Sequence, residues 1–430
     1  MLSFNLRKSF LYSVDVFSAV LFGIGTLVIL ARYFSKVEVA HLATTQSACA
    51  LLAFLITLGL DQFLAREFSK GKGKGCLLGV LIIQSILFFP YVGLVYFVLQ
   101  FGEKISLFNV LVVACGFAFS ISNPAKIYLQ AHNLAEKCAQ AAIFSRLVGL
   151  FFLLFLVVSG ADYSLCLLYL PVQSALFFFI NVYHARELIG DGVGVGETFR
   201  LIREAFPVLA ASVIYPVYMY ADNLILSFFG AGEKIAIYAP ASKIVIQLFL
   251  IGQIVSLTFY KHLTSRVDFP EEFSRYCKAL GQVYFFIAIL TVFSVFLLSD
   301  VLILFLFGSG FSDSSGVLRI LCLTLLFSIP GALFSRLLII TRNSKIELYK
   351  SLITASVCVA ANLLFVPLFG IHGAAVASVL SYFVADFLSY FLFRETRVLV
   401  VGVFCGYLDL FVSPVFALRN IVSTLKSVPL

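Results

Sequence analysis

The sequence predicts an all-α membrane protein of about twelve transmembrane helices, arranged as two six-helix bundles. Hydrophobic residues make up 61% of the 430 residues and charged residues only 12%, which is about half the charged share of a soluble domain. Apolar stretches of about 20 residues or more, each long enough to cross a hydrocarbon core about 30 Å thick, follow one another along almost the whole chain. A chain with this pattern carries its function within the membrane.

Short polar or glycine-containing connections separate the predicted spans. The first span follows Arg7 and Lys8. It is longer than the core of a signal peptide and has no small-residue cleavage site, so we expect it to be retained. The twelve spans are predicted at residues 9–33, 39–64, 76–100, 106–130, 139–159, 163–183, 204–229, 235–259, 279–307, 317–341, 346–368 and 373–393.

These spans divide into an amino-terminal lobe, residues 1–190, and a carboxy-terminal lobe, residues 200–395, followed by a tail, residues 396–430. Within the tail, the apolar run at 398–418 is interrupted by two glycines, an aspartate and a proline. We expect this run to form an interfacial or partly inserted helix, with a thirteenth span as the alternative.

The connections predict a cytoplasmic amino terminus. The amino terminus and every second connection after it hold nineteen lysines and arginines, a set in which we count Lys345 and Lys350, whereas the other connections hold five. Positive residues are retained on the cytoplasmic side of membranes. The formal charge of +8 also suits a surface of anionic lipid. No basic block with interleaved aromatic residues stands outside the spans, so we expect no nucleic-acid partner.

Two segment pairs predict an internal repeat. ILARYFSKVEVAHLA, from Ile29, aligns with ILSFFGAGEKIAIYA, from Ile225, and KIYLQAHN, from Lys126, aligns with RLLIITRN, from Arg336. Because each half has six spans, both halves enter the membrane from the same side. The repeat is then parallel, with its pseudo-twofold axis along the membrane normal, and substrates of such carriers bind between the halves. Chance similarity between apolar helices is the alternative.

Apart from the cations that we count with the connections, such as Lys350, four cations lie within the predicted spans, and they are the leading substrate-binding candidates: Lys126, Arg146, Lys243 and Arg336. A charge at the centre of a membrane helix costs about 2.5–3.5 kcal/mol on insertion scales, so it normally faces a cavity or a partner. The first and last lie near the cytoplasmic ends of their spans, where snorkelling to the interface is an alternative. The other two lie deeper, and we expect them to line a cavity.

The acids that we place inside spans are Asp15, Asp222 and Asp386, with Asp61 near the inner end of its span. Each could form a structural salt bridge with one of the cations. In the stretch PVYMYADNLILSF, Asp222 stands beside Asn223 and follows Tyr218, and we expect these three residues to contact the substrate at the gap between the halves. Asp15 and Asp222 are the candidates for coupling to protons or sodium. We expect no other cofactor.

Several function classes lack their sequence signatures. The nine cysteines are scattered singly and the five histidines form no catalytic or metal-ligating set, so we expect no metal site and no enzyme. KGKGKG, residues 70–75, lacks the spacing and the strand of a phosphate-binding loop. Nothing is similar to a channel filter built from repeated loops. A carrier remains.

Three stretches resemble the polysaccharide-export flippases of the multidrug/oligosaccharidyl-lipid/polysaccharide exporter superfamily, which include the O-antigen flippases. They are residues 206–244, residues 306–321 and, most specifically, ANLLFVPLFGIHGAAVASVLSYFVADF at 361–387. In the last stretch we expect the small residues Gly370, Gly373, Ala374, Ala375 and Ala377 to form a tight outer turn with close helix packing.

The resemblance implies a V-shaped, MATE-like pair of bundles that works by alternating access. It implies a flippase in the bacterial cytoplasmic (inner) membrane that translocates an undecaprenyl-diphosphate-linked oligosaccharide, such as an O-antigen or lipopolysaccharide repeat unit. Membrane lipid, a polysaccharide polymerase and a chain-length regulator would then be partners. We expect a monomer, because two lobes already enclose a pathway.

Two alternatives stay open. A multidrug exporter of the same superfamily would exchange organic cations for sodium or protons, and acids should dominate its cavity; four cations against three acids favour an anionic substrate. A membrane-embedded glycosyltransferase or ligase that uses a lipid-linked sugar would need a large outer loop with catalytic acids, yet all the predicted outer loops are short.

Overall fold

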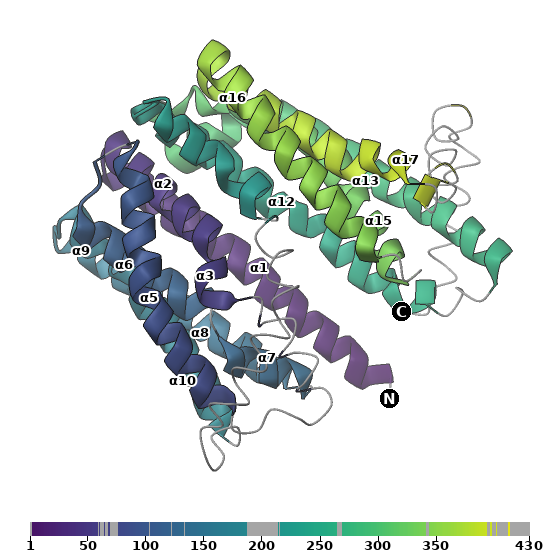
Figure 1. Cartoon of the computed structure of the whole chain (residues 1–430), viewed down its shortest axis with the longest axis horizontal. Helices are drawn as coiled ribbons and strands as arrows, with labels where there is room; N and C mark the ends of the chain where they lie inside the picture. The colour runs from purple at the N-terminus through teal and green to yellow at the C-terminus, as the bar shows by residue number, and fades with distance from the viewer. Residues whose placement is uncertain are drawn as a thin grey trace. The chain divides into compact units, whose positions relative to one another are not determined.

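The computed structural model is helical, as predicted, and contains no strand among the residues that it describes (Figure 1). These are residues 2–58, 76–102, 104–121, 123–132, 134–186, 216–264, 269–340 and 344–393, with single positions at 60, 64, 68, 214, 396, 397, 401 and 412. A helix satisfies every backbone hydrogen bond within its own segment, which a chain surrounded by lipid requires. The all-α prediction is confirmed.

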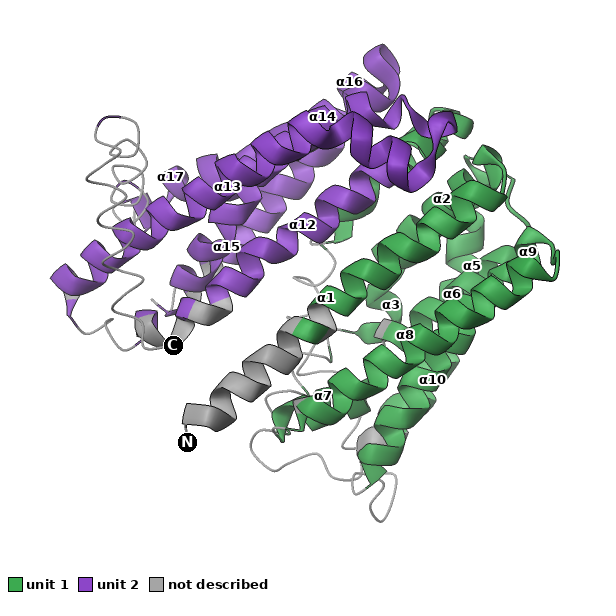
Figure 2. Ribbon diagram, turned by 180° about the vertical axis from the view of Figure 1, so that it is seen from behind, with its two compact units in different colours: residues 1–239 green, residues 240–430 purple. Residues whose placement is uncertain are grey.

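The chain forms two compact units, residues 1–239 and residues 240–430 (Figure 2). The predicted lobe boundary at 190–200 lies outside the described residues, as does nearly all of the tail, including most of the apolar run at 398–418. The division into lobes at that boundary therefore stays a prediction.

Unit 1 contains nine labelled helices and a further helical segment at 216–228 among its described residues. The labelled helices are α1 (Leu2–Tyr33), α2 (Lys36–Leu52), α3 (Phe54–Thr57), α5 (Cys76–Gln100), α6 (Leu107–Ile121), α7 (Pro124–Ala131), α8 (Ala135–Val158), α9 (Tyr163–Cys166) and α10 (Tyr169–His184). Helices α6, α10, α8 and α1 pack side by side in that order (Figure 1).

The helix boundaries in unit 1 follow from capping residues. Ser35 forms a capping box with Glu38 and starts α2, because each side chain satisfies a backbone donor that the first turn leaves unpaired. Asn123 caps α7 through its side chain and Pro124 occupies the first turn, so the apolar run predicted as one span divides into α6 and α7.

Unit 2 consists of long helices. They are α12 (Glu233–Thr264, which begins in unit 1), α13 (Pro270–Phe307), α14 (Ser314–Leu321), α15 (Leu325–Ile340), α16 (Ser344–Phe383) and α17 (Ser389–Leu392), with short 3₁₀ turns at η2 (Ser309–Phe311) and η3 (Cys322–Thr324) and a π-helix at η4 (Val384–Leu388). Helix α13 packs against α14 and α15, and α15 packs against α16 and η4.

The small-residue segment in α16 forms the expected tight turn. Gly370 has φ 57° and ψ −130°, a non-helical conformation that breaks α16 into two helical segments and that glycine adopts without a steric penalty. A β-carbon at Gly373 would overlap the carbonyl of Phe365, and Ala374 is fully buried. The two predicted spans on either side of this turn are therefore adjacent, as the sequence indicates.

Nine helical stretches of the described residues are long and apolar enough to cross a membrane, and Phe17–Tyr33 is a shorter apolar helix. One of the nine, Ile346–Leu392, has 47 residues, about twice the length needed for one crossing, and it contains the turn at Gly370. The protein is thus a multi-pass membrane protein. The count of twelve spans stays a prediction.

Candidate functional site

The four predicted cations lie on helices of both units. Lys126 is on α7 and Arg146 on α8, in unit 1, whereas Lys243 is on α12 and Arg336 on α15, in unit 2. All four residues are partly buried.

Lys243 has no hydrogen-bond or ion-pair partner among the described side chains, although it is partly buried in the apolar surroundings of α12. It follows Pro240 by one turn. Proline cannot donate a backbone hydrogen bond and disturbs the helix just before it. Lys243 thus presents a positive charge that no acid in the described part of the chain neutralises.

Among the described residues, Arg336 and Lys126 contact neutral groups. Arg336 donates from Nη2 to Oε1 of Gln253, on α12, at 3.4 Å. Lys126 places its Nζ 6.0 Å from the centre of the Phe177 ring, on α10. Neither cation forms an ion pair with a described acid. An unneutralised charge within a membrane protein normally faces water, an interface or a charged ligand.

Arg146 connects two helices of unit 1. Its Nη1 donates a hydrogen bond of 2.5 Å to Oγ of Ser18, which is a buried residue of α1. The guanidinium has five donors in a planar fork. This contact fixes the position of the Arg146 side chain between α8 and α1.

Asp222 and Asn223 lie in the helical segment 216–228 of unit 1 and contact different helices. Asp222 is 6% exposed, and its Oδ2 accepts a hydrogen bond of 2.7 Å from the hydroxyl of Tyr238, on α12. Asn223 donates to Oγ of Ser47, on α2, at 2.9 Å, and its own Oδ1 is buried without a hydrogen-bond partner among the described residues. Tyr218 is partly buried. The polar pair is thus hydrogen-bonded within unit 1.

The side chain of Asp15 lies outside the described residues, although its backbone belongs to α1. Its role in ion coupling stays a prediction, as does the role of Asp222. The predicted meeting of these residues with Lys243 and Arg336 at one chamber between the halves also stays a prediction.

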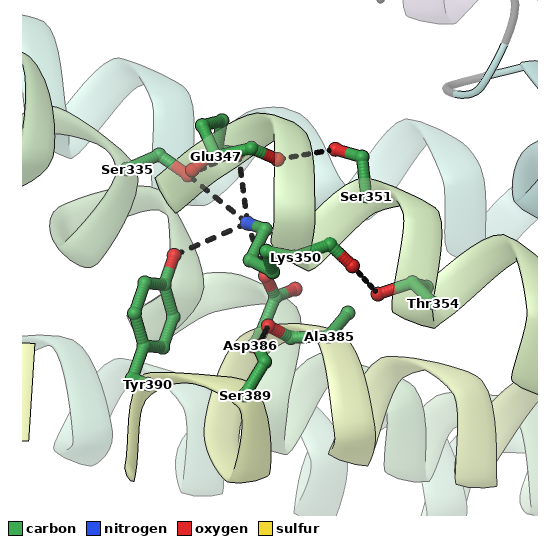
Figure 3. Close-up of polar contacts among 9 residues, drawn as sticks. All are labelled: Ser335, Glu347, Lys350, Ser351, Thr354, Ala385, Asp386, Ser389 and Tyr390. Atoms are coloured by element: carbon green, nitrogen blue, oxygen red, sulfur yellow. Dashed lines mark hydrogen bonds and ion pairs between the residues drawn. The ribbon is translucent and has the colours of Figure 1, made fainter. Parts of the chain in front are cut away.

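Sequence reasoning missed a buried cation in unit 2. Lys350 falls inside the predicted span 346–368, yet we count it with the lysines of the connections; the structure places it within α16, where it is 4% exposed. Its Nζ contacts Oε1 of Glu347 at 2.8 Å, the hydroxyl of Tyr390 at 3.1 Å and Oδ1 of Asp386 at 3.3 Å (Figure 3). Asp386 therefore forms a salt bridge, as the alternative for each buried acid allows, but with Lys350 and not with one of the four candidate cations.

A signal for this contact exists in the sequence. Lys350 and Asp386 lie at comparable distances along the chain from the turn at Gly370, on either side of it. Two antiparallel helices joined at a tight turn bring such positions level with each other, so the turn itself predicts the pair.

Comparison with known proteins places this arrangement in a family. The family model described as polysaccharide biosynthesis protein matches residues 6–260, more than half of the chain. No curated protein matches the sequence.

Three solved structures share the fold over nearly their whole length. The lipid II flippase MurJ, in an inward closed conformation, superimposes with a TM-score of 0.74 at 16% identity, covering 97% of this chain and 96% of that one. An inward-facing multidrug resistance MATE family transporter of the MOP superfamily gives 0.65 at 14% identity, with 98% and 96% covered. The eukaryotic MATE transporter AtDTX14 gives 0.51 at 13% identity, with 99% of both chains covered. The chain has the fold of these transporters and belongs to the polysaccharide biosynthesis protein family.

Proposed function

We propose that this protein is a flippase that moves an anionic, lipid-linked oligosaccharide across the membrane by alternating access. One observation carries the proposal: Lys126, Lys243 and Arg336 lie in membrane helices and have no acidic partner among the described residues. Membership of a polysaccharide biosynthesis family and the fold of a lipid II flippase support the same conclusion.

The physical argument concerns the head group of the substrate. A sugar diphosphate cannot enter hydrocarbon unaided, because its charges and hydroxyl groups would lose their water. Lysine and arginine form strong, charge-assisted hydrogen bonds with phosphate oxygens. Cations that are not neutralised by the protein's own acids are therefore available for a diphosphate. The polyprenyl tail can stay in the lipid while the head group moves.

The finer assignment concerns substrate and location. The substrate is an undecaprenyl-diphosphate-linked repeat unit of an O-antigen or another surface polysaccharide, and the membrane is the bacterial inner membrane, with the amino terminus in the cytoplasm. Arg146, Asp222, Asn223 and Tyr218 complete the substrate contacts, and protons or sodium couple through Asp15 and Asp222. The protein acts as a monomer and supplies a polysaccharide polymerase and its chain-length regulator.

A multidrug exporter is the second candidate. The likeness to the inward-facing MATE family transporter favours it. The two candidates require opposite charges in the substrate path, because an organic cation binds beside acids and a diphosphate binds beside cations. The state of Asp386 favours the flippase, because this acid already has a cation, Lys350, as its partner. The third candidate is an enzyme that uses the same lipid-linked sugar. It is the least favoured of the three, because the matched structures are those of a flippase and transporters.

Transport in proteoliposomes tests the proposal. Purified protein is reconstituted with a fluorescent polyprenyl-diphosphate oligosaccharide in one set of vesicles and with a fluorescent organic cation in another. We expect movement of the lipid-linked sugar between leaflets and no uptake of the cation. Arg146→Ala and Lys243→Ala should abolish this movement while the protein stays folded in the membrane.

Lys234→Ala is the matched control, since Lys234 lies on the same helix, α12, as Lys243 but is exposed. We expect it to transport as the wild type does. Transport of the organic cation instead of the lipid would identify the exporter, and full activity of both cation variants would overturn the cationic site.

A further inference from the structure

A buried cluster in unit 2 joins three helical elements through one lysine. Lys350, on α16, contacts Glu347 on the same helix, Asp386 on η4 and Tyr390 on α17 (Figure 3). On the side of α15, Ser335 approaches Lys350 Nζ at 3.5 Å and donates to Glu347 Oε1 at 3.3 Å. The described titratable and charged side chains around Asp386 are thus Glu347, Lys350 and Tyr390.

The described side chains of this cluster carry more negative than positive charge. Two carboxylates, from Glu347 and Asp386, share one ammonium. An ammonium has three donors, and the carboxylates compete for them with a tyrosine and a serine. Glu347 Oε2 is buried and accepts no hydrogen bond from the described residues. A carboxylate oxygen that is buried without a hydrogen-bond partner is costly, and binding of one proton removes the excess charge.

The backbone is shaped around Asp386. The helix is widened to a π-helix at Val384–Leu388, and Asp386 lies in the middle of it. π-Helical turns are rare and occur frequently at functional sites. Facing it on α15 is Gly331, where an added β-carbon would overlap the Asp386 carboxyl group. Two elements therefore make room for this one side chain.

One member of the cluster is more exposed than the other two. The Glu347 side chain is 39% exposed, whereas those of Asp386 and Lys350 are 14% and 5% exposed. Glu347 thus links the buried pair to the surroundings of the protein, and the predicted orientation places it near the cytoplasmic end of its span.

We propose that Glu347, Lys350 and Asp386 form a proton-binding site that, when it is deprotonated, holds the segment of α16 before Gly370 against η4 and α17. A proton from water binds a carboxylate of the cluster and converts it to a carboxylic acid, and Lys350 then pairs with the carboxylate that remains. The proton belongs to the coupled group rather than to one residue. Protonation at Asp386 breaks its ion pair with Lys350 and frees η4 from the segment of α16 before Gly370.

Infrared difference spectroscopy tests the site without substrate. The purified full-length protein is stepped from neutral to acidic pH, and the carboxylic-acid carbonyl band is recorded. We expect a band in the wild type that is absent from the double variant Asp386→Asn with Glu347→Gln. Whichever single variant also loses the band identifies the carboxylate that binds the proton. Asp300→Asn is the matched control, because Asp300 pairs with Arg319 in the same unit but is 62% exposed, and its band from the cluster should persist. A wild-type band that survives in the double variant would overturn the site.

A transport measurement then connects the site to coupling, and this arm alone rests on the proposed flippase function. We expect a pH gradient to accelerate transport by the wild type in proteoliposomes, and to accelerate transport by Asp386→Asn less, because only the coupling candidates Asp15 and Asp222 remain in that variant. Gradient stimulation that is undiminished in both Asp386→Asn and Glu347→Gln would contradict the coupling role. If the wild type moves no lipid-linked sugar at all, the proposed function fails while the infrared result stands.

Discussion

Lys243 and Lys350 are both lysines within membrane helices of unit 2, and their surroundings are opposite. Lys350 is 4% exposed and contacts two carboxylates, a tyrosine and a serine. Lys243 is partly buried and has no such partner among the described residues. The first is neutralised by the protein, and the second is left for something else to neutralise.

This difference separates structural cations from candidate ligand-binding cations. A buried ion pair contributes little net stability, but removal of one member leaves an uncompensated charge and costs about 3–5 kcal/mol. An unpaired cation costs stability already, so its removal should be tolerated. Both lysines lie within helices, so their position does not distinguish them. The presence or absence of neighbouring acids does.

The largest effect is expected for Lys350→Met. The substitution leaves Asp386 without its cation, and we expect a loss of about 3 kcal/mol in the free energy of unfolding, with reduced abundance in the membrane. Thermal unfolding of the detergent-solubilised protein measures it.

The double variant Lys350→Met with Asp386→Asn is the control, because it removes both partners of the buried pair. It should recover much of the lost stability. If the single variant is as stable as the wild type, the cluster does not hold these helices together.

The same substitution at Lys243 should have the reverse consequence. In Lys243→Met we expect the free energy of unfolding to stay within about 1 kcal/mol of the wild type. Transport should fall by at least roughly tenfold, because a hydrogen bond to a charged group contributes about 1.5–3 kcal/mol. Initial rates in proteoliposomes, compared at equal protein content, measure the loss. A Lys243→Met protein that unfolds like Lys350→Met would show that both lysines are structural.

The fold was largely predictable because lipid imposes it. The length and hydropathy of each membrane helix, and the turn at Gly370, depend on residues that are adjacent in sequence. The break between α6 and α7 likewise follows from Asn123 and Pro124. The sequence did not predict the burial of Lys350, because a lysine near the end of a predicted helix is usually assigned to the adjoining loop. Its burial depends on Asp386, 36 positions away.

The polar pair of the helical segment 216–228 shows the same limit. Its aspartate and asparagine were predicted to lie together at one gap, because they are neighbours in sequence. In the structure Asp222 contacts Tyr238 and Asn223 contacts Ser47, since successive residues of a helix point about 100° apart. Local sequence therefore identified the residues but not their partners.

A third prediction compares the two buried acids, Asp222 and Asp386. At equal pH on both sides of the membrane, Asp222→Asn should weaken transport more than Asp386→Asn, by roughly fivefold, the equivalent of about 1 kcal/mol. Asp222 accepts a hydrogen bond from Tyr238 and is one of the proposed substrate contacts, whereas Asp386 forms an ion pair with Lys350. Initial rates of transport in proteoliposomes at equal pH measure both variants. The reverse order would remove Asp222 from the pathway.

The smallest expected effect is the difference in stability between two tyrosine variants, one that loses a hydrogen bond to a charged group and one that loses a neutral hydrogen bond. Tyr390→Phe removes the acceptor that lies 3.1 Å from Lys350 Nζ, and Tyr284→Phe removes a hydroxyl that donates to Ser256 Oγ at 2.9 Å in the same unit. Both hydroxyls are buried. A hydrogen bond to a charged group contributes about 1.5–3 kcal/mol and a neutral one about 1 kcal/mol. Tyr390→Phe should therefore unfold at a lower temperature than Tyr284→Phe. Equal unfolding temperatures would mean that Lys350 is held by its carboxylates alone, and the buried cluster would then be a salt bridge with a tyrosine beside it.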